Sequence, residues 1–418
     1  MSRKSQTVLW GIWIAVFVLL VCVLIRYCKD NHAEPVENSE DRQLVLMVTY
    51  ETEPYRKALT WFAEEYSGQS GNPRVVIDFV AQSDFQKELC IDKDQDRLPD
   101  LIICENVMTP ALVSMGILRD LSDYMTNERT VFFNTTAYNS TVVNGSCYGI
   151  PLTCDPYVLY YNEDYLLKHG GVMPKKMEEF YEWTRTARTQ GVYNLGIALK
   201  NKEDATACLT QFIYSYGGTI RDLNGAHCMD LYEMLAGMRD DGIVSQDMIN
   251  WNQSDLMYYF ADGMVSVVMA RMSSSALLNA EHMDFTYRVT EIPYAQRPAY
   301  LMHGENIGIT VDADEKEALQ FAEYMTSKDT MERYDRMVHC LSVRSDLSVN
   351  PLEAQGLEDA FIQKQRERGL LKSSYSSWFL ISGAFGEEIN RFFGDSSIDA
   401  NRLSEDIQDA VRVAIMER

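Results

Sequence analysis

Basic side chains are scarce in this chain of 418 residues: 38 Lys and Arg stand against 61 Asp and Glu, a formal net charge of -23. This excess of negative charge opposes binding to phosphate backbones and to anionic membrane surfaces, because like charges repel. The patterns GxSxG, GxxxxGK[ST] and HExxH, which mark hydrolases, P-loop enzymes and zinc proteases, are also missing. The sequence therefore gives no support to nucleic-acid binding or to these enzyme classes.

Metal-binding patterns are missing as well. The nine cysteines and six histidines are scattered, with no CxxC pair and no paired Cys/His spacing. Alternate Asp residues at 92–96 imitate a calcium loop, but Arg97 stands where that loop needs glycine. Cys147 and Cys154 are close enough in sequence to form a disulfide, although buried thiols are the expected state. We therefore expect neither a metal nor a cofactor.

The N-terminus carries a long apolar run. Residues 8–25, VLWGIWIAVFVLLVCVLI, contain no charge and have the length of a short transmembrane helix. We interpret 1–29 as a cytosolic tip and an uncleaved membrane anchor, because the run is long for a signal peptide. Cys22 offers an alternative, since lipoprotein signals place a lipidated Cys after such a run. The acidic residues 30–42 are typical of a tether, which would hold the body on the extracytoplasmic side.

The body is predicted to fold as more than one unit. Apolar residues make up 46% of the chain, enough for a folded core. A chain of this length exceeds what one core usually supports, so two lobes are expected. Hydrophobic periodicity predicts strands and helices in alternation, with strands at 44–49, 75–80 and 100–104 and helices at 55–66 and 85–90. This alternation is typical of a parallel sheet in an α/β fold.

Polar side chains follow the third of these strands. Glu105 and Asn106 come directly after its apolar residues, at its carboxyl end. Ligands of open α/β sheets bind outside the carboxyl ends of the strands. The sequence therefore predicts a ligand site at this edge, although the fold alone does not name the ligand.

Five segments, taken in order, resemble the extracellular solute-binding proteins of carbohydrate ABC transporters, the family of maltose-binding-protein-like receptors. They are PDLIICENV at 99–107, YGIPLTCDPYVLYYNED at 148–164, FADGMVSVVMARMSSSALL at 260–278, HGENIGITVDADEKEALQFAEYMTS at 303–327 and the two terminal helices at 375–414. In the family these segments hold the cleft turn, the crossings between lobes and the closing helices. The resemblance covers the chain after the tether and rests on the order of the segments rather than on one motif.

The resemblance implies an α/β fold, a two-lobed periplasmic-binding-protein-like clamp of type II, behind the N-terminal transmembrane helix. The first lobe would combine 43–152 with 262–304, the second 153–261 with 305–372, and 373–418 would form C-terminal helices bracing the lobes. Ligand would favour the closed form by contacting both lobes. The chain would be a non-enzymatic, monomeric receptor in a bacterial cell membrane that delivers a carbohydrate to the permease subunits of an ABC transporter.

The resemblance also implies which residues contact the ligand. Carboxylates and amides suit vicinal hydroxyls, a guanidinium donates several hydrogen bonds, and an aromatic ring can stack on a pyranose. The candidates are Tyr50, Glu51, Glu105, Asn106, Asp155, Trp251, Arg271, Glu305, Asn306 and Trp378. Residues 270–273 replace a glycine and an aromatic found in many relatives, so one aromatic platform is missing and a maltodextrin ligand is not assumed.

Seven of the candidates have a structural alternative, and the function has two. Glu105 could cap a helix, Asp155 could make a hinge hydrogen bond, and Arg271 could form an ion pair. Glu305 and Asn306 could cap a crossing, and Trp251 and Trp378 could pack in the core. A type II membrane glycosyltransferase would also have a membrane anchor and acidic triplets such as DQD at 94–96 and DAD at 312–314. It would need a divalent metal and a nucleotide-sugar, however. A binding body could also sense a sugar without transporting it.

Overall fold

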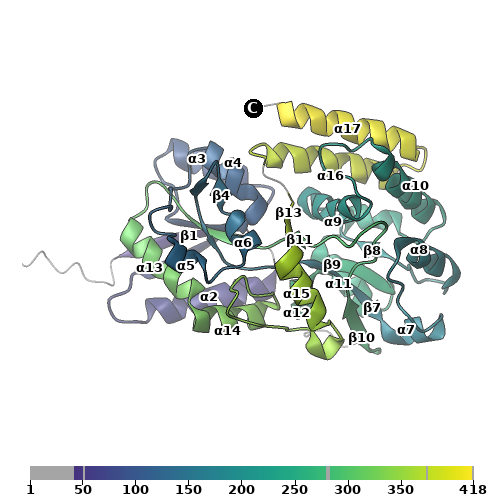
Figure 1. Ribbon diagram of the computed structural model, residues 1–418, viewed down its shortest axis with the longest axis horizontal. Coiled ribbons are helices and arrows are strands. Elements are labelled where there is room, and N and C mark those ends of the chain that lie inside the picture. Colours follow the sequence, from purple (N-terminus) through teal and green to yellow (C-terminus); the bar gives the residue numbers. More distant parts are fainter. Residues whose placement is uncertain (1–41, 50–51, 279–282, 373–374, 417–418) are drawn as a thin grey trace, which may run out of the picture.

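The protein is described by a computed structural model that covers residues 42–49, 52–278, 283–372 and 375–416 (Figure 1). The candidate membrane anchor at 8–25 and the candidate ligand residues Tyr50 and Glu51 lie outside the described residues. Within the described ranges, no helix is both long and apolar enough to cross a membrane.

The first lobe is built on a five-stranded sheet in the order β2-β1-β3-β12-β6. Its elements confirm the predicted strand and helix alternation, with β1 (Gln43–Val48), α2 (Glu53–Ser67), β2 (Arg74–Phe79), α3 (Phe85–Asp94) and β3 (Leu101–Glu105). β1 runs parallel to β2 and to β3, whereas β12 (Glu305–Ile309) runs antiparallel to β3 and to β6 (Ile150–Pro151). Every residue of β3 is buried, as expected for an apolar strand in the middle of a sheet.

Helices cover this sheet on both faces (Figure 1). The long ones after β12 are α13 (Glu315–Thr326) and α14 (Lys328–Val338), and they pack against α2. Phe62, Phe321 and Tyr334 meet in the core between these helices. Shorter elements connect β3 to β6, namely η1 (Asn106–Met108), α4 (Thr109–Ser114), α5 (Asn127–Thr130), α6 (Thr135–Asn139), β4 (Val142–Val143) and β5 (Ser146–Cys147).

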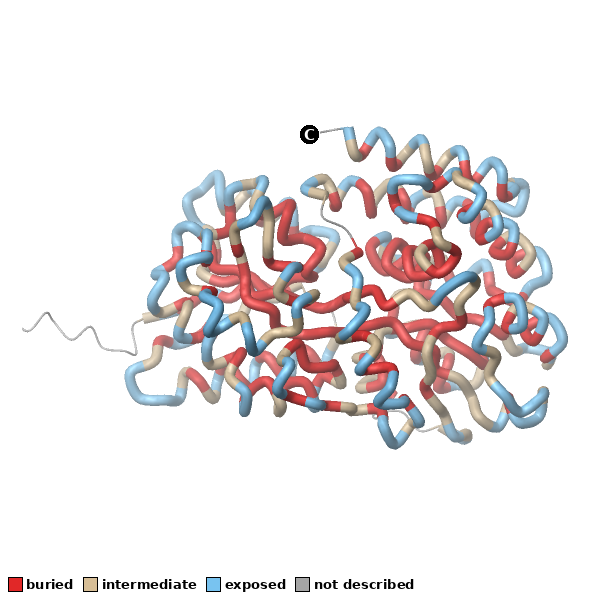
Figure 2. The backbone as a smooth tube through the Cα atoms, viewed as in Figure 1, coloured by how far each residue is buried: buried red, intermediate tan, exposed pale blue. Residues whose placement is uncertain are grey.

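The second lobe contains a four-stranded sheet in the order β10-β7-β9-β8. Its strands are β7 (Tyr157–Asn162), β8 (Gly196–Ile197), β9 (Val267–Arg271) and β10 (Tyr287–Thr290). Its helices are α7 (Glu163–Lys168), α8 (Met177–Thr186), α9 (Lys202–Ser215), α10 (Ala226–Asp240), η2 (Gln246–Asn250), α11 (Gln253–Ala261), η3 (Met272–Ser274) and α12 (Ser275–Leu278). Figure 2 shows that buried chain runs through the interior of both lobes, with exposed chain on the outside.

The remaining elements lie near the junction or at the C-terminus. They are β11 (Leu301–Met302), η4 (Glu353–Gln355), α15 (Asp359–Arg368), β13 (Leu370–Leu371), α16 (Trp378–Gly394) and α17 (Ala400–Met416). β11 pairs with β13. α16 packs on α9 and also contacts η1 of the first lobe, while α17 packs on α16 and α10. Cys147 and Cys154 are both free and buried, as expected from the sequence.

The strand pairing corrects the predicted division into lobes. Residues 262–304 were expected in the first lobe and 305–372 in the second, but β9 and β10 belong to the second sheet and β12 belongs to the first. β12 pairs with β3 along its whole length, from Glu305 opposite Glu105 to Ile309 opposite Leu101. Hydrogen bonding of that strand and the packing of α13 and α14 therefore place the start of this segment with the first lobe.

Candidate ligand-binding site

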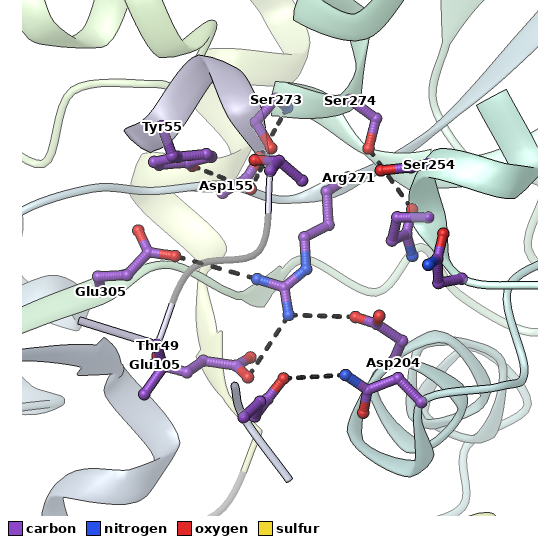
Figure 3. A pocket seen from close by; sticks show the side chains of 15 residues that line it. Thr49, Tyr55, Glu105, Asp155, Asp204, Ser254, Arg271, Ser273, Ser274 and Glu305 are labelled. Atoms are coloured by element: carbon purple, nitrogen blue, oxygen red, sulfur yellow. Dashed lines mark hydrogen bonds and ion pairs between the residues drawn. The ribbon is translucent and has the colours of Figure 1, made fainter. Parts of the chain in front are cut away.

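A cavity of about 210 Å³ lies where the two lobes face each other. The first lobe contributes Thr49, Thr52, Tyr55, Gln82, Glu105 and Glu305, and the second contributes Asn201, Asp204, Asn252, Gln253, Ser254, Arg271, Ser273 and Ser274. Asp155, from the chain that crosses between β6 and β7, completes the lining. Figure 3 shows that these side chains converge from both lobes.

Strand register brings the two glutamates of the first lobe together. Glu105 is the last residue of β3 and Glu305 is the first residue of β12, and the antiparallel pairing places them opposite each other. Both are almost fully buried. Because the two strands enter the cleft edge in opposite directions, one edge of the sheet carries both carboxylates.

Arg271, the last residue of β9, extends from the second lobe between the carboxylates (Figure 3). Its Nη2 lies 3.5 Å from Glu105 Oε2 and 3.5 Å from Asp204 Oδ1, and its Nη1 lies 4.0 Å from Glu305 Oε1. Burial acts to lower the pKa of Arg271, but the surrounding negative charges, Glu105 foremost, outweigh burial and raise it well above the usual value. The guanidinium therefore stays charged and joins the two lobes electrostatically.

Asp155 also connects the lobes. Its Oδ1 accepts a hydrogen bond from the Ser273 backbone N–H at 2.8 Å, and its Oδ2 accepts from Ser273 Oγ at 2.7 Å and from Tyr55 OH at 3.3 Å. Tyr55 belongs to α2 of the first lobe, whereas Ser273 follows β9 of the second. Burial raises the pKa of Asp155, although the charge of Arg271 and these donors oppose the rise.

A buried ion-pair network lies behind the cavity. Lys372 Nζ donates to Glu105 Oε1 at 2.9 Å and to Glu203 Oε1 at 2.6 Å, and Trp378 Nε1 donates to Glu203 Oε2 at 2.8 Å. Burial opposes ionisation of Glu105, but the charges of Lys372 and Arg271 outweigh it and hold its pKa well below the usual range. Burial raises the pKa of Glu203. Lys372 thus links β3 of the first lobe to α9 of the second.

Four of the ten predicted ligand residues line the cavity: Glu105, Asp155, Arg271 and Glu305. Trp378 begins α16, the first of the two terminal helices that the resemblance implies, but its side chain is fully buried and donates to Glu203 behind the cavity. A role in stacking on a sugar is therefore not supported by its position. The ligand contacts of the four lining residues stay a prediction.

Three other predicted residues lie away from the cavity lining. Asn106 Nδ2 donates to the Met302 carbonyl at 3.3 Å, and Asn306 Nδ2 donates to Thr109 Oγ1 at 3.1 Å. Trp251 is buried and packs on Tyr259, with the ring centroids 4.4 Å apart. Successive side chains of a strand point to opposite faces, which is why Asn306 points away from the site when Glu305 points into it.

Apart from Arg271, sequence reasoning missed the side chains that the second lobe contributes to the cavity, although one signal was available. Asn252 accepts a hydrogen bond from the Asp255 N–H at 2.8 Å, and Asp255 Oδ2 accepts from the Asn252 N–H at 3.0 Å, which forms a capping box at the start of α11. Asn201 caps α9 in a similar way. Both caps have recognisable sequence patterns, and both helix starts supply polar side chains to the cavity.

His303 makes the stability of this site dependent on pH. It is fully buried, its Nδ1 lies 3.5 Å from Glu105 Oε1, and burial lowers its pKa from 6.5 to about 4. Between pH 6.5 and about 4, the imidazole of His303 is therefore protonated in the unfolded chain but neutral in the folded chain. The free energy of unfolding falls as the pH falls through this window.

We expect acidification from pH 7 to pH 5 to remove about 2 kcal/mol of unfolding free energy through His303 alone. Urea unfolding at the two pH values, in the natural chain and in His303→Gln, isolates this contribution because the carboxylates titrate in both proteins. The same loss in both proteins would show that His303 does not carry the effect.

Together these features define a two-lobed α/β solute-binding protein with a periplasmic-binding-protein-like fold. Residues 61–352 match the family of bacterial extracellular solute-binding proteins, and the chain belongs to that family. It is a family of binding proteins, not of enzymes, so the glycosyltransferase alternative has no support.

The individual relatives have low sequence identity to this chain. Putative binding proteins of Brucella abortus (strain 2308) and Brucella suis biovar 1 (strain 1330) are each 22% identical over 328 residues, covering 75% of this chain and 78% of theirs. Among solved structures, maltose-bound MalE3 of T. maritima superposes with a TM-score of 0.77 at 15% identity, covering 89% of this chain and 99% of that one. A solute-binding protein from Agrobacterium radiobacter K84 in complex with ribitol gives 0.77 at 16% identity, covering 90% and 100%. At these identities the likeness establishes the fold.

Proposed function

We propose that the protein is a receptor that binds a carbohydrate in the cavity between its lobes and delivers it to the permease of an ABC transporter. The observation that carries the proposal is the lining: both lobes supply hydroxyl, amide and carboxylate groups to one cavity. Such groups suit the hydroxyls of a sugar, which both donate and accept. The maltose and ribitol complexes of the two structural relatives support a polyhydroxylated ligand.

Hinge closure would allow a transporter to distinguish the ligand-bound receptor from the empty one. A ligand that contacts Glu105 and Gln82 of the first lobe together with Asn201 of the second has more contacts in the closed form than in the open one. The ligand would therefore bind the closed form more tightly than the open form, and this difference in affinity would shift the population toward the closed form. The Asp155 bridge between Tyr55 and Ser273 lies at the crossing and would act as a fixed point of the movement.

The receptor would act outside the cytoplasm, in keeping with a family of extracellular binding proteins. The apolar run 8–25 would serve as an uncleaved anchor, or Cys22 would carry a lipid in its place, and the acidic segment 30–42 would tether a monomeric body to the membrane. The bulk negative charge of the body would keep it off the anionic membrane surface.

Thermal and urea unfolding against a panel of neutral mono- and oligosaccharides and polyols tests the proposal. A carbohydrate held a hundredfold above its Kd should raise the unfolding free energy by about 2.7 kcal/mol. Gln82→Ala removes one lining amide and should weaken that carbohydrate roughly tenfold, as expected for the loss of about 1.5 kcal/mol of hydrogen bonding. Gln190→Ala, on the exposed surface, is the matched control. If peptides stabilise the protein and no carbohydrate or polyol does, the proposal is wrong.

A further inference from the structure

A second and larger cavity adjoins the cavity described above. Its volume is about 680 Å³, against about 210 Å³ for the first cavity. Gln82, Asn201 and Asn252 line both cavities, so the two lie next to each other between the lobes. Asn201 Nδ2 donates to Gln82 Oε1 at 3.1 Å. This hydrogen bond joins a first-lobe side chain to a second-lobe side chain at the boundary between the cavities.

Three parts of the fold form the walls of the second cavity. Besides the three shared residues, its lining includes Ser83, Gln86, Met108, Phe379 and Ser382. The first lobe contributes Gln86 from α3 and Met108 from η1, and α16 contributes Phe379. Because α16 packs on α9 and also contacts η1, the second cavity is enclosed by the same junction that holds the lobes together.

The uncharged side chains of the second cavity suit a sugar unit. The amides of Gln82, Gln86, Asn201 and Asn252 supply both donors and acceptors of hydrogen bonds. The half-buried ring of Phe379 adds apolar surface. A pyranose has hydroxyls at its edge and C–H groups on its faces, so it can use the amides and the ring at once. Apolar walls with a few placed polar groups are typical of small-molecule sites.

The charged side chains of the second cavity favour a neutral ligand. Among the lining residues that the structure describes, the charged ones are Lys200, Lys202 and Glu203. Glu203 accepts hydrogen bonds from Lys372 and Trp378, and Lys202 pairs with Glu387. Lys200 is exposed, so solvent and salt screen its charge.

We infer that the ligand is a neutral oligosaccharide that spans both cavities, with one sugar unit in the first cavity and the next unit in the second. This inference rests on the proposed function and narrows its ligand class. A monosaccharide in the first cavity would leave the contacts of the second cavity unused. Ser83 and Gln86 are exposed, so the second cavity opens to solvent on their side and leaves room for further units.

The boundary between the cavities connects ligand length to closure of the lobes. The bond between the two sugar units would lie beside Gln82 and Asn201, which come from opposite lobes. A ligand that contacts both side chains has more contacts in the closed form than in the open form. A disaccharide should therefore favour closure more strongly than its own monosaccharide.

Titration calorimetry of the full chain with matched length series tests the inference. The series are glucose, maltose and maltotriose; mannose, mannobiose and mannotriose; xylose, xylobiose and xylotriose; and the same lengths of any other sugar that the binding panel identifies. We expect the disaccharide of at least one series to bind roughly tenfold or more tightly than its monosaccharide, as one or two added hydrogen bonds would give. Its heat capacity change should also be more negative, because the ring of Phe379 loses contact with water.

Two variants connect this advantage to the second cavity. Gln86→Ala and Phe379→Leu change residues that line the second cavity and not the first. Each should reduce the advantage of the disaccharide over the monosaccharide roughly three- to tenfold. Phe379 also packs near Phe85, with the ring centroids 6.4 Å apart. Gln86 is exposed, so Gln86→Ala keeps the test valid if Phe379→Leu does not fold.

Gln95→Ala is the matched control for Gln86→Ala. Gln95 is an exposed glutamine at the C-terminal end of α3 and lies outside the lining of both cavities. The advantage of the disaccharide should stay unchanged in this variant. An equal loss in Gln95→Ala and in Gln86→Ala would mean that the effect comes from α3 in general and would contradict a sugar unit in the second cavity.

The outcomes separate this inference from the proposed function. Monosaccharides or polyols that bind as tightly as every longer saccharide would overturn the inference and leave the carbohydrate receptor in place. An advantage of the disaccharide that is unchanged in the folded variants of the second cavity would overturn that cavity as the site of the second unit. If no saccharide and no polyol binds, both proposals are wrong.

Discussion

Replacement of Lys372 with Met is expected to lower the free energy of unfolding by about 3–5 kcal/mol, the usual cost of removing one partner from a buried ion pair. Lys372 is fully buried and donates to both Glu105 and Glu203. Met fills a similar volume, so the loss comes from charge rather than from a cavity. Without the ammonium, two buried carboxylates face each other and Glu203 keeps only Trp378 among the donors named above.

Lys364→Met is the matched control for this prediction. Lys364 also pairs with a glutamate, Glu291 at 2.6 Å, but its side chain is 36% exposed and solvent screens the pair. Its loss should cost about 1 kcal/mol or less. Urea unfolding of the two variants and of the natural chain gives the comparison. Equal, small losses in both variants would mean that solvent reaches Lys372 and that the network does not hold the lobes together.

The local part of the fold could be read from the sequence. Apolar stretches predict β1, β2 and β3 to within one or two residues at each end, because these strands are buried and their patterns are local. The position of Glu105 at the cleft follows from the same reasoning, since the carboxyl ends of parallel strands share one edge. The two carboxylates and the guanidinium that the resemblance added also line the cavity.

The non-local part could not be read from the sequence. The short strand β12, Glu-Asn-Ile-Gly-Ile, has no pattern of its own that selects one sheet over the other, and its partner β3 lies about two hundred positions earlier in the chain. Lys372 follows Leu370 and Leu371, and nothing in this stretch of sequence indicates a buried cation. Its burial is decided by Glu105 and Glu203, which are 267 and 169 positions away. No local pattern carries that information.

Trp378 shows that the position of a residue in a helix does not determine its contacts. It begins α16, the first of the two terminal helices that the resemblance implies, and packing in the core was the alternative to stacking on a sugar. Here the indole nitrogen finds Glu203, and the ring lies over the Lys372 ammonium at 5.3 Å. A buried carboxylate and a buried cation therefore hold this Trp away from the cavity, with a contribution from cation–π attraction.

Gly304→Ala is expected to cost roughly 2–6 kcal/mol of unfolding free energy, from a strained backbone and an overpacked contact together. Gly304 has φ +140, a region that residues with a side chain rarely adopt. A Cβ built there would lie 2.1 Å from the Thr153 carbonyl oxygen and 3.0 Å from Cys154 Cα. The crossing between β6 and β7 and the crossing between β11 and β12 meet at this point. The atoms that the Cβ would meet belong to the backbone, so no side chain can rotate away.

Hydrogen bonds on either side of Gly304 prevent the two crossing segments from moving apart to relieve the steric clash. The Asp155 N–H donates to the His303 carbonyl at 2.8 Å, and the Leu152 N–H donates to the Glu305 carbonyl at 2.9 Å, one on each side of Gly304. Moving the crossings apart would break these bonds and shift Asp155 and Glu305, both of which line the cavity. We therefore expect Gly304→Ala to weaken the best ligand of the binding panel as well as the fold.

Gly383→Ala separates this steric effect from the general effect of adding a methyl group. Gly383 lies inside α16, and a Cβ there would meet nothing within 4 Å. Ala in a helix interior should stabilise the chain by up to about 1 kcal/mol. Urea unfolding of both variants, with calorimetry of the same ligand, gives opposite signs for stability if the crossings are held as described. A Gly304→Ala protein as stable as Gly383→Ala would mean that the two crossings can separate freely, which would remove the fixed hinge that the proposed closure around a ligand requires.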